Sequence, residues 1–364
     1  MVYTVWFMDT GTLLIPFGML YGLGVGVRNS LYERSWLRTH HLGARTVSIG
    51  NITTGGTGKT PLVAAVAEML ADSGEDVCIL TRGYGRENAK RRVLVSDRNA
   101  LLADAATGGD EPVELARRLI GKAYVLADPD RVAAARWAKD AFGITAFVLD
   151  DGFQHRRARR DLDIVCIDTT DPFGGERLLP AGRLREPLRG LRRADVFVIT
   201  RTELSPDTES IAARLREYNP AAPIFFASAT ITRMADLGTY LSAAGPAAPE
   251  LPPSAATGSD AVRFVAFCGL AKPENFFAGL RLRGCNIVET VTFPDHHRYT
   301  PADLSRLRGL ASESAATLVT TAKDAVKLDP YTLGAPCLVA LASTVFNPSP
   351  HGPDAAAFRT LITT

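Results

Sequence analysis

Short apolar runs alternate with helix-like segments through most of the chain. The apolar runs between residues 46 and 228 lie at 46–50, 77–80, 91–95, 123–128, 145–151, 162–168 and 194–200. Between several of them, as at 62–70 and 131–142, apolar residues recur with the period of a helix. Strands that are separated by crossover helices pair in parallel. The pattern therefore predicts an α/β fold with a doubly wound, mostly parallel sheet.

Composition divides the chain into four parts. Residues 232–260 are rich in alanine, proline, glycine and serine, which predicts a flexible linker or insertion. The main sheet would then occupy residues 46–231. A smaller α/β domain would occupy 261–364, where an apolar run precedes a helical pattern at 273–283. Residues 1–45 would form an N-terminal helical segment.

The N-terminal segment has an uncharged stretch that differs from a signal peptide and from a membrane span. Residues 10–27 contain five glycines and Pro16, whereas a spanning helix needs about 20 strongly apolar residues. A signal peptide begins with basic residues, but the first basic residue here is Arg28. From Pro16 onward the apolar positions have helical spacing, and basic residues gather at the end. This amphipathic pattern fits either a helix resting on an anionic bilayer or a helix packed on the next domain.

A glycine-rich loop follows the first strand of the main sheet. The sequence TVSIGNITTGGTGKTP at 46–61 places the glycines between an apolar strand and a helical pattern. Glycines let several backbone N–H groups converge, and the following helix N-terminus favours anions. The strict G-x-x-x-x-G-K-[ST] motif would have glycine at position 53, where this chain has Thr53. The intact G-G-x-G-K-T core still predicts a phosphate-binding loop, in which Lys59 reaches the outer phosphates and Thr60 holds Mg²⁺.

Carboxylates mark two further positions. The apolar run at 145–151 ends in Asp150 and Asp151, a pattern typical of the Mg²⁺-binding strand of nucleoside triphosphatases. In the GGDEP segment, Asp110 precedes Pro112 at the start of a helical pattern. Its side chain could cap that helix or take part in catalysis.

Charge is balanced overall but unevenly distributed. The chain of 364 residues has 41 basic and 39 acidic residues, and ten arginines lie between residues 156 and 193. Arginine pairs well with phosphate oxygens, although a solvated basic face would explain many of these arginines. The five cysteines include no C-x-x-C pair, which argues against a zinc site or a disulfide framework and favours a reducing compartment. His296 and His297 lack nearby partners for a metal site and are read as surface histidines when considered alone.

Taken in order, seven motifs resemble the tetraacyldisaccharide 4′-kinases of lipid A synthesis. They are GNITTGGTGKTP, TRGYGR, GGDEP, DDGFQHRR, GGERLLPAGRLREP, FPDHHRYT and TTAKDAVKL. The resemblance extends from the N-terminal helix to about Leu328; it departs from the family at Thr54 and in the length of 232–260. It implies a P-loop kinase that moves the γ-phosphate of ATP to the 4′-hydroxyl of tetraacyldisaccharide 1-phosphate. The product would be the bis-phosphorylated lipid A precursor, lipid IVA.

The resemblance also implies roles for particular residues. Nucleotide binding falls to Thr54, Gly55, Gly56, Thr57, Gly58, Lys59, Thr60 and Gln154. The Mg²⁺ ion would be held by Thr60, Asp150 or Asp151, with support from Glu186. Asp110 would accept the proton of the sugar hydroxyl with His296 as its partner, while Lys59 and Arg185 would neutralise charge on the transferred phosphoryl group.

An acylated substrate implies a peripheral enzyme on the anionic cytoplasmic face of the bacterial inner membrane, with no nucleic-acid partner. The oligomeric state stays open. One alternative is a P-loop switch or partitioning-type ATPase that acts through a protein partner, since such proteins share the G-G-x-G-K-T loop. Another is a soluble small-molecule kinase with the same core.

Overall fold

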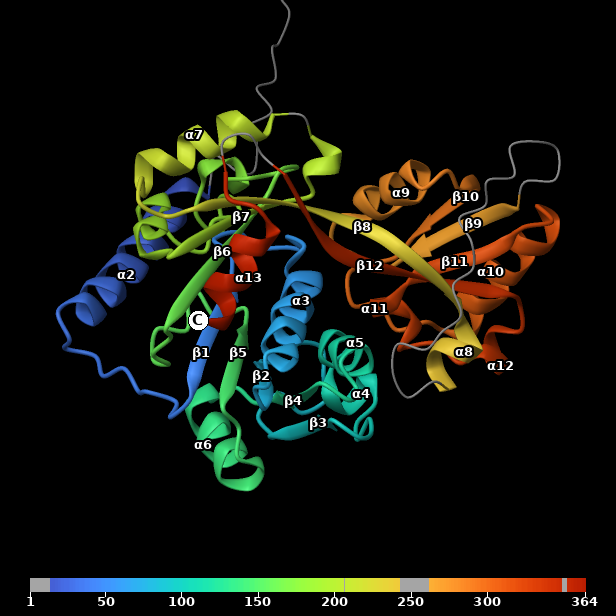
Figure 1. Cartoon of the computed structure of the whole chain (residues 1–364). Helices are drawn as coiled ribbons and strands as arrows, with labels where there is room; N and C mark the ends of the chain where they lie inside the picture. Colours follow the sequence, from blue (N-terminus) through green and yellow to red (C-terminus); the bar gives the residue numbers. More distant parts are fainter. Residues whose placement is uncertain (1–13, 206, 243–261, 349–351) are drawn as a thin grey trace, which may run out of the picture.

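The strands of this chain form one continuous mixed sheet. The computed structural model describes residues 14–205, 207–242, 262–348 and 352–364. Within them, twelve strands lie in the order β10-β9-β11-β12-β8-β7-β6-β1-β5-β2-β4-β3. Figure 1 shows the first half of the chain at one end of this sheet and most of the second half at the other.

The first half has the predicted doubly wound arrangement. Its parallel strands are β1 (Arg45–Gly50), β2 (Val77–Thr81), β4 (Ala123–Ala127), β5 (Ala146–Asp150), β6 (Leu162–Asp168) and β7 (Val196–Thr200). Only the edge strand β3 (Val93–Asp97) pairs antiparallel, with β4. Helices α3 (Lys59–Asp72) and α5 (Asp110–Arg118) cover one face, and α6 (Arg131–Phe142) and α7 (Thr208–Tyr218) cover the other. The predicted fold class is therefore confirmed.

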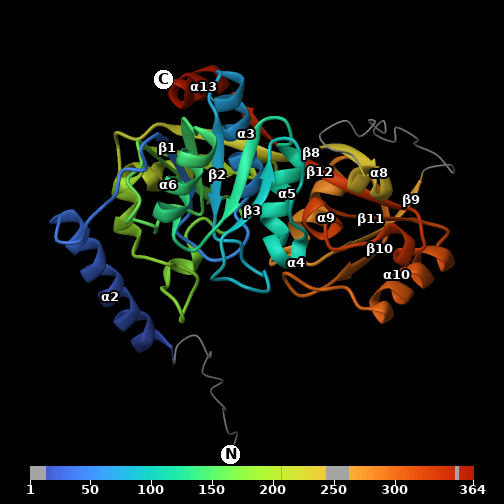
Figure 2. The ribbon, with the colours of Figure 1, turned by 90° about the horizontal axis from the view of Figure 1, so that it is seen from below.

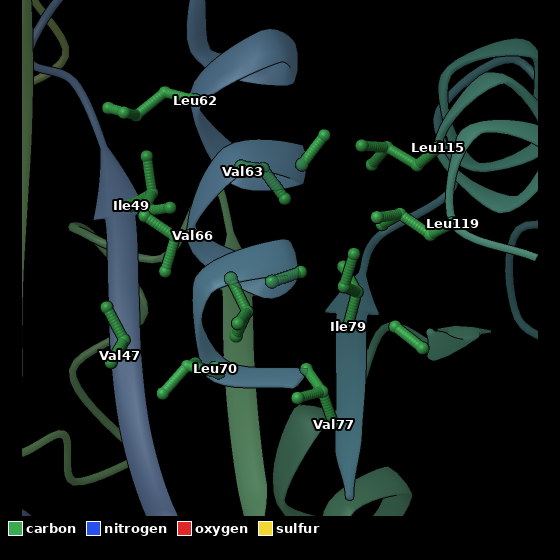
Figure 3. Close-up of a cluster of buried hydrophobic side chains, with 14 of the residues drawn as sticks. Val47, Ile49, Leu62, Val63, Val66, Leu70, Val77, Ile79, Leu115 and Leu119 are labelled. Carbon is green, nitrogen blue, oxygen red and sulfur yellow. The ribbon is translucent and has the colours of Figure 1, made fainter. Parts of the chain in front are cut away.

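Alternating side chains of the strands explain the two covered faces. Val47 and Ile49 of β1 point toward α3, where they meet Leu62 and Val66, as Figure 3 shows. The intervening residues of neighbouring strands, such as Phe147 of β5, pack under α6 on the opposite face. Burial on both sides is why these strands appear in the sequence as continuous apolar runs.

Two long strands join the halves of the sheet. β8 (Ile224–Asp236) pairs in parallel with β7 at its start, and then runs antiparallel along β12 (Cys337–Asn347). On the far side of β12 lie β11 (Thr317–Thr321), β9 (Arg263–Cys268) and β10 (Asn286–Thr292), with the helices α9 (Pro273–Leu282) and α10 (Pro301–Glu313). The second half is thus an extension of the first sheet, and Figure 1 shows β8 and β12 spanning both.

This arrangement corrects the predicted segment boundaries. Residues 232–236 belong to β8 and 237–242 to α8 (Leu237–Ser242), so they are not a linker. Met234 and Leu237 are buried, which accounts for the order of this stretch. The remaining linker residues, 243–260, lie outside the described residues. At the other end, α13 (Ala355–Thr363) returns to the first half, because Phe358 and Ile362 pack into the core beneath α3.

The N-terminal helix has an unusual distribution of side chains. α2 (Ile15–Glu33) ends before Leu37, so the helical pattern in the sequence extends further than the helix does. Its buried positions are Gly18, Gly22 and Asn29, while its large apolar residues Phe17, Met19, Leu20, Leu23 and Val27 are more than half exposed. Figure 2 shows α2 at the periphery of the molecule. No helix in the described part of the chain is long and apolar enough to span a bilayer.

Candidate active site

A cleft of about 480 Å³ lies where the two halves of the chain meet, at the carboxyl ends of β1, β2 and β5. The first half contributes the glycine-rich loop from Gly55 to Thr60, with Asp150, Asp151 and Arg185. The second half contributes Lys272, Asp295, His296 and Lys323. Residues that are far apart in sequence therefore share one cavity, at the edge where open α/β sheets bind ligands.

The glycine-rich loop is held in a shape that suits phosphate. Gly55 and Gly58 have φ angles of +97° and +73°, which disfavour other residues, and Gly58 directly precedes α3. Two contacts from the end of β7 support the loop backbone: the Thr200 hydroxyl donates to the Thr57 carbonyl at 2.9 Å, and Arg201 donates to the Gly56 carbonyl at 2.8 Å. The loop is thus preformed at the N-terminus of a helix, where anions bind.

Thr54 contacts Arg183, whereas the residues from Gly55 to Thr60 line the cleft. Its backbone N–H donates to the Arg183 carbonyl, and its carbonyl accepts from the Arg183 guanidinium at 2.7 Å. Thr54 itself does not line the cleft. Thr54 therefore fixes the base of the loop.

The two aspartates after β5 have opposite pKa shifts. Burial, reinforced by Glu111 and Asp151, raises the pKa of Asp150 to about 6. Burial would also raise the pKa of Asp151, but the cations Lys59 and Arg185 hold it at about 2. The Arg185 guanidinium lies 2.6 Å from the Asp151 carboxylate, and the Lys59 ammonium lies 3.4 Å from it. Asp151 is therefore ionised near neutral pH with its charge already balanced, while Asp150 titrates close to the physiological range.

These residues fit a hard divalent cation. Asp150, Asp151 and Thr60 line the same cleft, and the buried Oδ1 of Asp151 makes no hydrogen bond, although the Lys59 ammonium lies 3.4 Å from it. No group of three His, Cys, Asp or Glu side chains in the described residues could hold a metal by itself. Mg²⁺ is commonly bound by one or two carboxylates together with substrate phosphates and water, which matches this donor set.

The pKa of Asp150 leads to a first prediction. Below about pH 6 its carboxyl takes up a proton, and a protonated carboxyl does not coordinate a cation. Mg²⁺-dependent binding of ATP is expected to weaken about tenfold for each pH unit below 6, as one proton competes with one ion. Titrations of a fluorescent ATP analogue with and without Mg²⁺, between pH 4.5 and 7.5, would measure this. In Asp150→Asn the Mg²⁺-dependent part of ATP binding should no longer change with pH in this range. The same pH dependence in this variant as in wild type would contradict the assignment.

Asp110 is hydrogen-bonded to His296, which lines the cleft, while Asp110 itself is buried directly behind His296 and does not line it. Asp110 is the first residue of α5, and its carboxylate lies 2.8 Å from Nδ1 of His296, 186 positions further along the chain. Burial would raise the pKa of Asp110, but His296, Lys323 and Lys327 hold it below its usual value. The hydrogen bond to Asp110 in turn raises the pKa of His296. His296 is therefore part of the site and is not a free surface histidine.

Lys323 is the third residue of this cluster and contacts the other ring nitrogen of His296. Its ammonium lies 3.0 Å from Glu111, 3.0 Å from Asp295 and 3.4 Å from Nε2 of His296. The lysine belongs to the TTAKDAVKL motif, for which no residue role was predicted. Pairing of carboxylates with a lysine from another element cannot be deduced from one sequence, so the only available signal was the motif itself.

Two predicted residues lie behind the cleft. Glu186 is fully buried, and its carboxylate accepts hydrogen bonds from Asn29, Gln154 and Arg193. Gln154 in turn donates to the Asn51 carbonyl at 2.8 Å. Neither side chain lines the cleft. The predicted metal role of Glu186 is therefore wrong, since its oxygens are occupied by donors, and Gln154 supports the glycine-rich loop from behind.

Comparisons with known proteins identify a family for this chain. The family model for tetraacyldisaccharide-1-P 4′-kinase matches residues 10–353. A tetraacyldisaccharide 4′-kinase from Syntrophus aciditrophicus strain SB is 39% identical over 321 residues, which cover 87% of this chain and 84% of the relative. One from Anaeromyxobacter dehalogenans strain 2CP-C is 43% identical over 307 residues, 84% of this chain and 78% of the relative.

The similarity extends to three dimensions. A crystal structure of LpxK from Aquifex aeolicus in complex with ATP aligns with a TM-score of 0.75 and 30% sequence identity. The alignment covers 97% of this chain and 98% of that one. With a family model that matches most of the chain and relatives near 40% identity, the chain belongs to the tetraacyldisaccharide 4′-kinase family.

Proposed function

We propose that this chain transfers the γ-phosphoryl group of ATP to the 4′-hydroxyl of tetraacyldisaccharide 1-phosphate and releases lipid IVA. The main support is the cleft, which the glycine-rich loop and His296 line together, with Asp110 hydrogen-bonded to His296. Phosphoryl transfer needs a phosphate cradle, charge neutralisation and an acceptor for the hydroxyl proton. The family membership and the ATP complex of the Aquifex aeolicus relative agree with this reaction.

The nucleotide would bind with its phosphates on the loop from Gly55 to Thr60. Lys59 would contact the β- and γ-phosphates after exchanging its contact with Asp151. A Mg²⁺ ion held by Thr60 with Asp150 or Asp151 would neutralise charge on the phosphate oxygens. Arg185, which already reaches into this part of the cleft, would neutralise charge on the phosphoryl group as it moves.

The acceptor hydroxyl must lose a proton as its oxygen attacks. Asp110 is ionised at neutral pH because its pKa is held low, so it can accept that proton. A carboxylate with a low pKa is a weak base, which makes its orientation important. His296 provides this orientation through its Nδ1, and Lys323 holds the opposite edge of the imidazole ring.

Incubation with γ-³²P-ATP and tetraacyldisaccharide 1-phosphate in mixed micelles tests the proposal. Label is expected to appear in a lipid that migrates as the bis-phosphorylated product on thin-layer chromatography, and only when both substrates are present. Release of inorganic phosphate without an acceptor, stimulated by a protein partner, would instead support the switch-type ATPase. Equal activity with and without detergent or liposomes would support a soluble small-molecule kinase.

The exposed side of α2 suits the peripheral location on the cytoplasmic face of the inner membrane that an acylated substrate requires. Phe17, Met19, Leu20 and Leu23 project from this helix into solvent. Basic residues follow at its end, and each one near an anionic surface contributes about 1 kcal/mol. We infer that α2 lies in the interfacial region of the bilayer and presents the cleft to the lipid substrate.

Removing two of these leucines gives a second prediction. Leu20 and Leu23 are 67% and 66% exposed, and burial of a leucine in an apolar phase is worth about 1.5–3 kcal/mol. The double variant Leu20→Ser/Leu23→Ser is therefore expected to bind vesicles with anionic phosphatidylglycerol at least about tenfold more weakly in co-sedimentation. Leu282→Ser, at a leucine that is 64% exposed on α9, is the control. An equal loss in the control would overturn the assignment.

A further inference from the structure

The inner side of α2 is hydrogen-bonded to the loop that carries Arg185. The Tyr21 hydroxyl donates to the Arg185 carbonyl at 2.8 Å, and the buried Asn29 amide donates to the Glu186 carboxylate at 3.2 Å. One turn before Tyr21 the helix also packs closely on the same loop, since a Cβ at Gly18 would lie 3.1 Å from the Leu178 carbonyl oxygen. The helix and the loop are therefore fixed to one another at several points.

Glu186 links this contact to the phosphate-binding loop. Its buried carboxylate accepts from three different segments, through Asn29, Gln154 and Arg193. Gln154 donates in turn to the Asn51 carbonyl, and the Asn51 side chain accepts from Lys59 at 3.1 Å. A buried carboxylate with several charged and amide donors is rigid, because losing one donor leaves a lone pair unsatisfied. Glu186 therefore connects α2, through Asn29, with the segment that supports the glycine-rich loop, through Gln154.

The backbone of Arg185 is held on both sides. Its N–H donates to the Ile52 carbonyl at 2.8 Å, and its own carbonyl accepts from Tyr21. Its side chain then extends to Asp151, where the guanidinium lies 2.6 Å from the carboxylate. A shift of α2 would therefore move the backbone of Arg185, and with it the guanidinium group of the same residue.

We propose that Tyr21 and Asn29 are positioning residues for Arg185. The side of α2 that contacts the protein then influences the turnover rate, while its exposed apolar side faces the membrane. This inference rests on the proposed role of Arg185 in phosphoryl transfer. A displacement of about 1 Å in a catalytic group can lower the rate by as much as about a hundredfold. The hydrogen bonds from α2 restrict such displacements.

Conservative variants separate positioning from membrane binding. Tyr21→Phe removes one hydroxyl and keeps the ring, and it is expected to lower kcat about fivefold. Asn29→Ala is expected to lower kcat about tenfold, because Glu186 then loses a buried donor. In both variants, vesicle binding and the KM for ATP should stay within about twofold of wild type. Tyr32→Phe is the matched control: it lies on the same helix, its ring contacts Arg156, and kcat should not change.

A double-variant cycle tests whether the effect passes through Arg185. If Tyr21 and Asn29 act by placing this arginine, adding either variant to Arg185→Ala should lower kcat no further. Equal kcat in wild type, Tyr21→Phe and Asn29→Ala, or additive losses in the double variants, would overturn the inference. Near-normal turnover of Arg185→Ala would instead show that the role proposed for Arg185 is wrong, which distinguishes the two failures.

Discussion

Replacing Arg185 with alanine is expected to lower turnover about a thousandfold or more, the range found when an arginine that stabilises a transferring phosphoryl group is lost. The side chain lines the cleft beside Asp151, so its charge is close to where the phosphates would lie. Binding of ATP should change much less than kcat, because this charge matters most when the phosphoryl group is moving. The rate of lipid labelling at saturating substrates would measure it.

Two further variants sharpen this test. Arg185→Lys keeps the charge but loses the planar fork, so it should recover only part of the rate. Arg177→Ala removes an exposed arginine from the same loop that does not line the cleft, and it should behave as wild type. Near-normal turnover in Arg185→Ala, or a similar loss in Arg177→Ala, would contradict the assignment.

Asp110→Asn is expected to lower turnover by roughly 10²–10⁴-fold, the usual contribution of a general base. The amide has nearly the same shape and can still accept a hydrogen bond from Nδ1 of His296, but it cannot take the proton of the sugar hydroxyl. Turnover by this variant should respond little to added Mg²⁺ or ATP, since neither replaces the missing base. Single-turnover labelling of the lipid would separate this loss from a slow release of product.

Asp104→Asn is the matched control for Asp110→Asn. Asp104 is the N-cap residue of α4 (Ala105–Gly108), exposed and six positions upstream. Because asparagine and aspartate are comparable N-caps, the fold and the turnover should both be retained. If Asp110→Asn kept wild-type kcat, the hydroxyl proton would have to leave by another group, and the proposed mechanism would fail.

Local patterns in the sequence were enough to predict the core and half of the site. Strands such as β5 and β6 are buried on both faces, so they are continuous apolar runs that can be recognised without a structure. The glycine-rich loop and the Asp150–Asp151 pair are also local, because phosphate and metal binding require particular residues at fixed spacing. The pairing of Asp110 with His296 could be predicted only from the family resemblance, because nothing in the sequence around either residue indicates that it contacts the other residue.

Contacts between distant segments were decided by the tertiary structure alone. The pairing of β8 with β12 joins segments about a hundred positions apart, and it makes residues 232–236 of the predicted linker part of the sheet. Glu186 looked like a metal ligand beside Arg185, but three donors from separate segments surround it and withdraw it from the cleft. For α2, the sequence determined an amphipathic helix, and only packing decided that its glycines face the protein and its large apolar residues face outward. Periodicity and loop motifs are set by neighbours along the chain, whereas burial, charge pairing and the facing of a helix depend on partners that only the folded chain brings together.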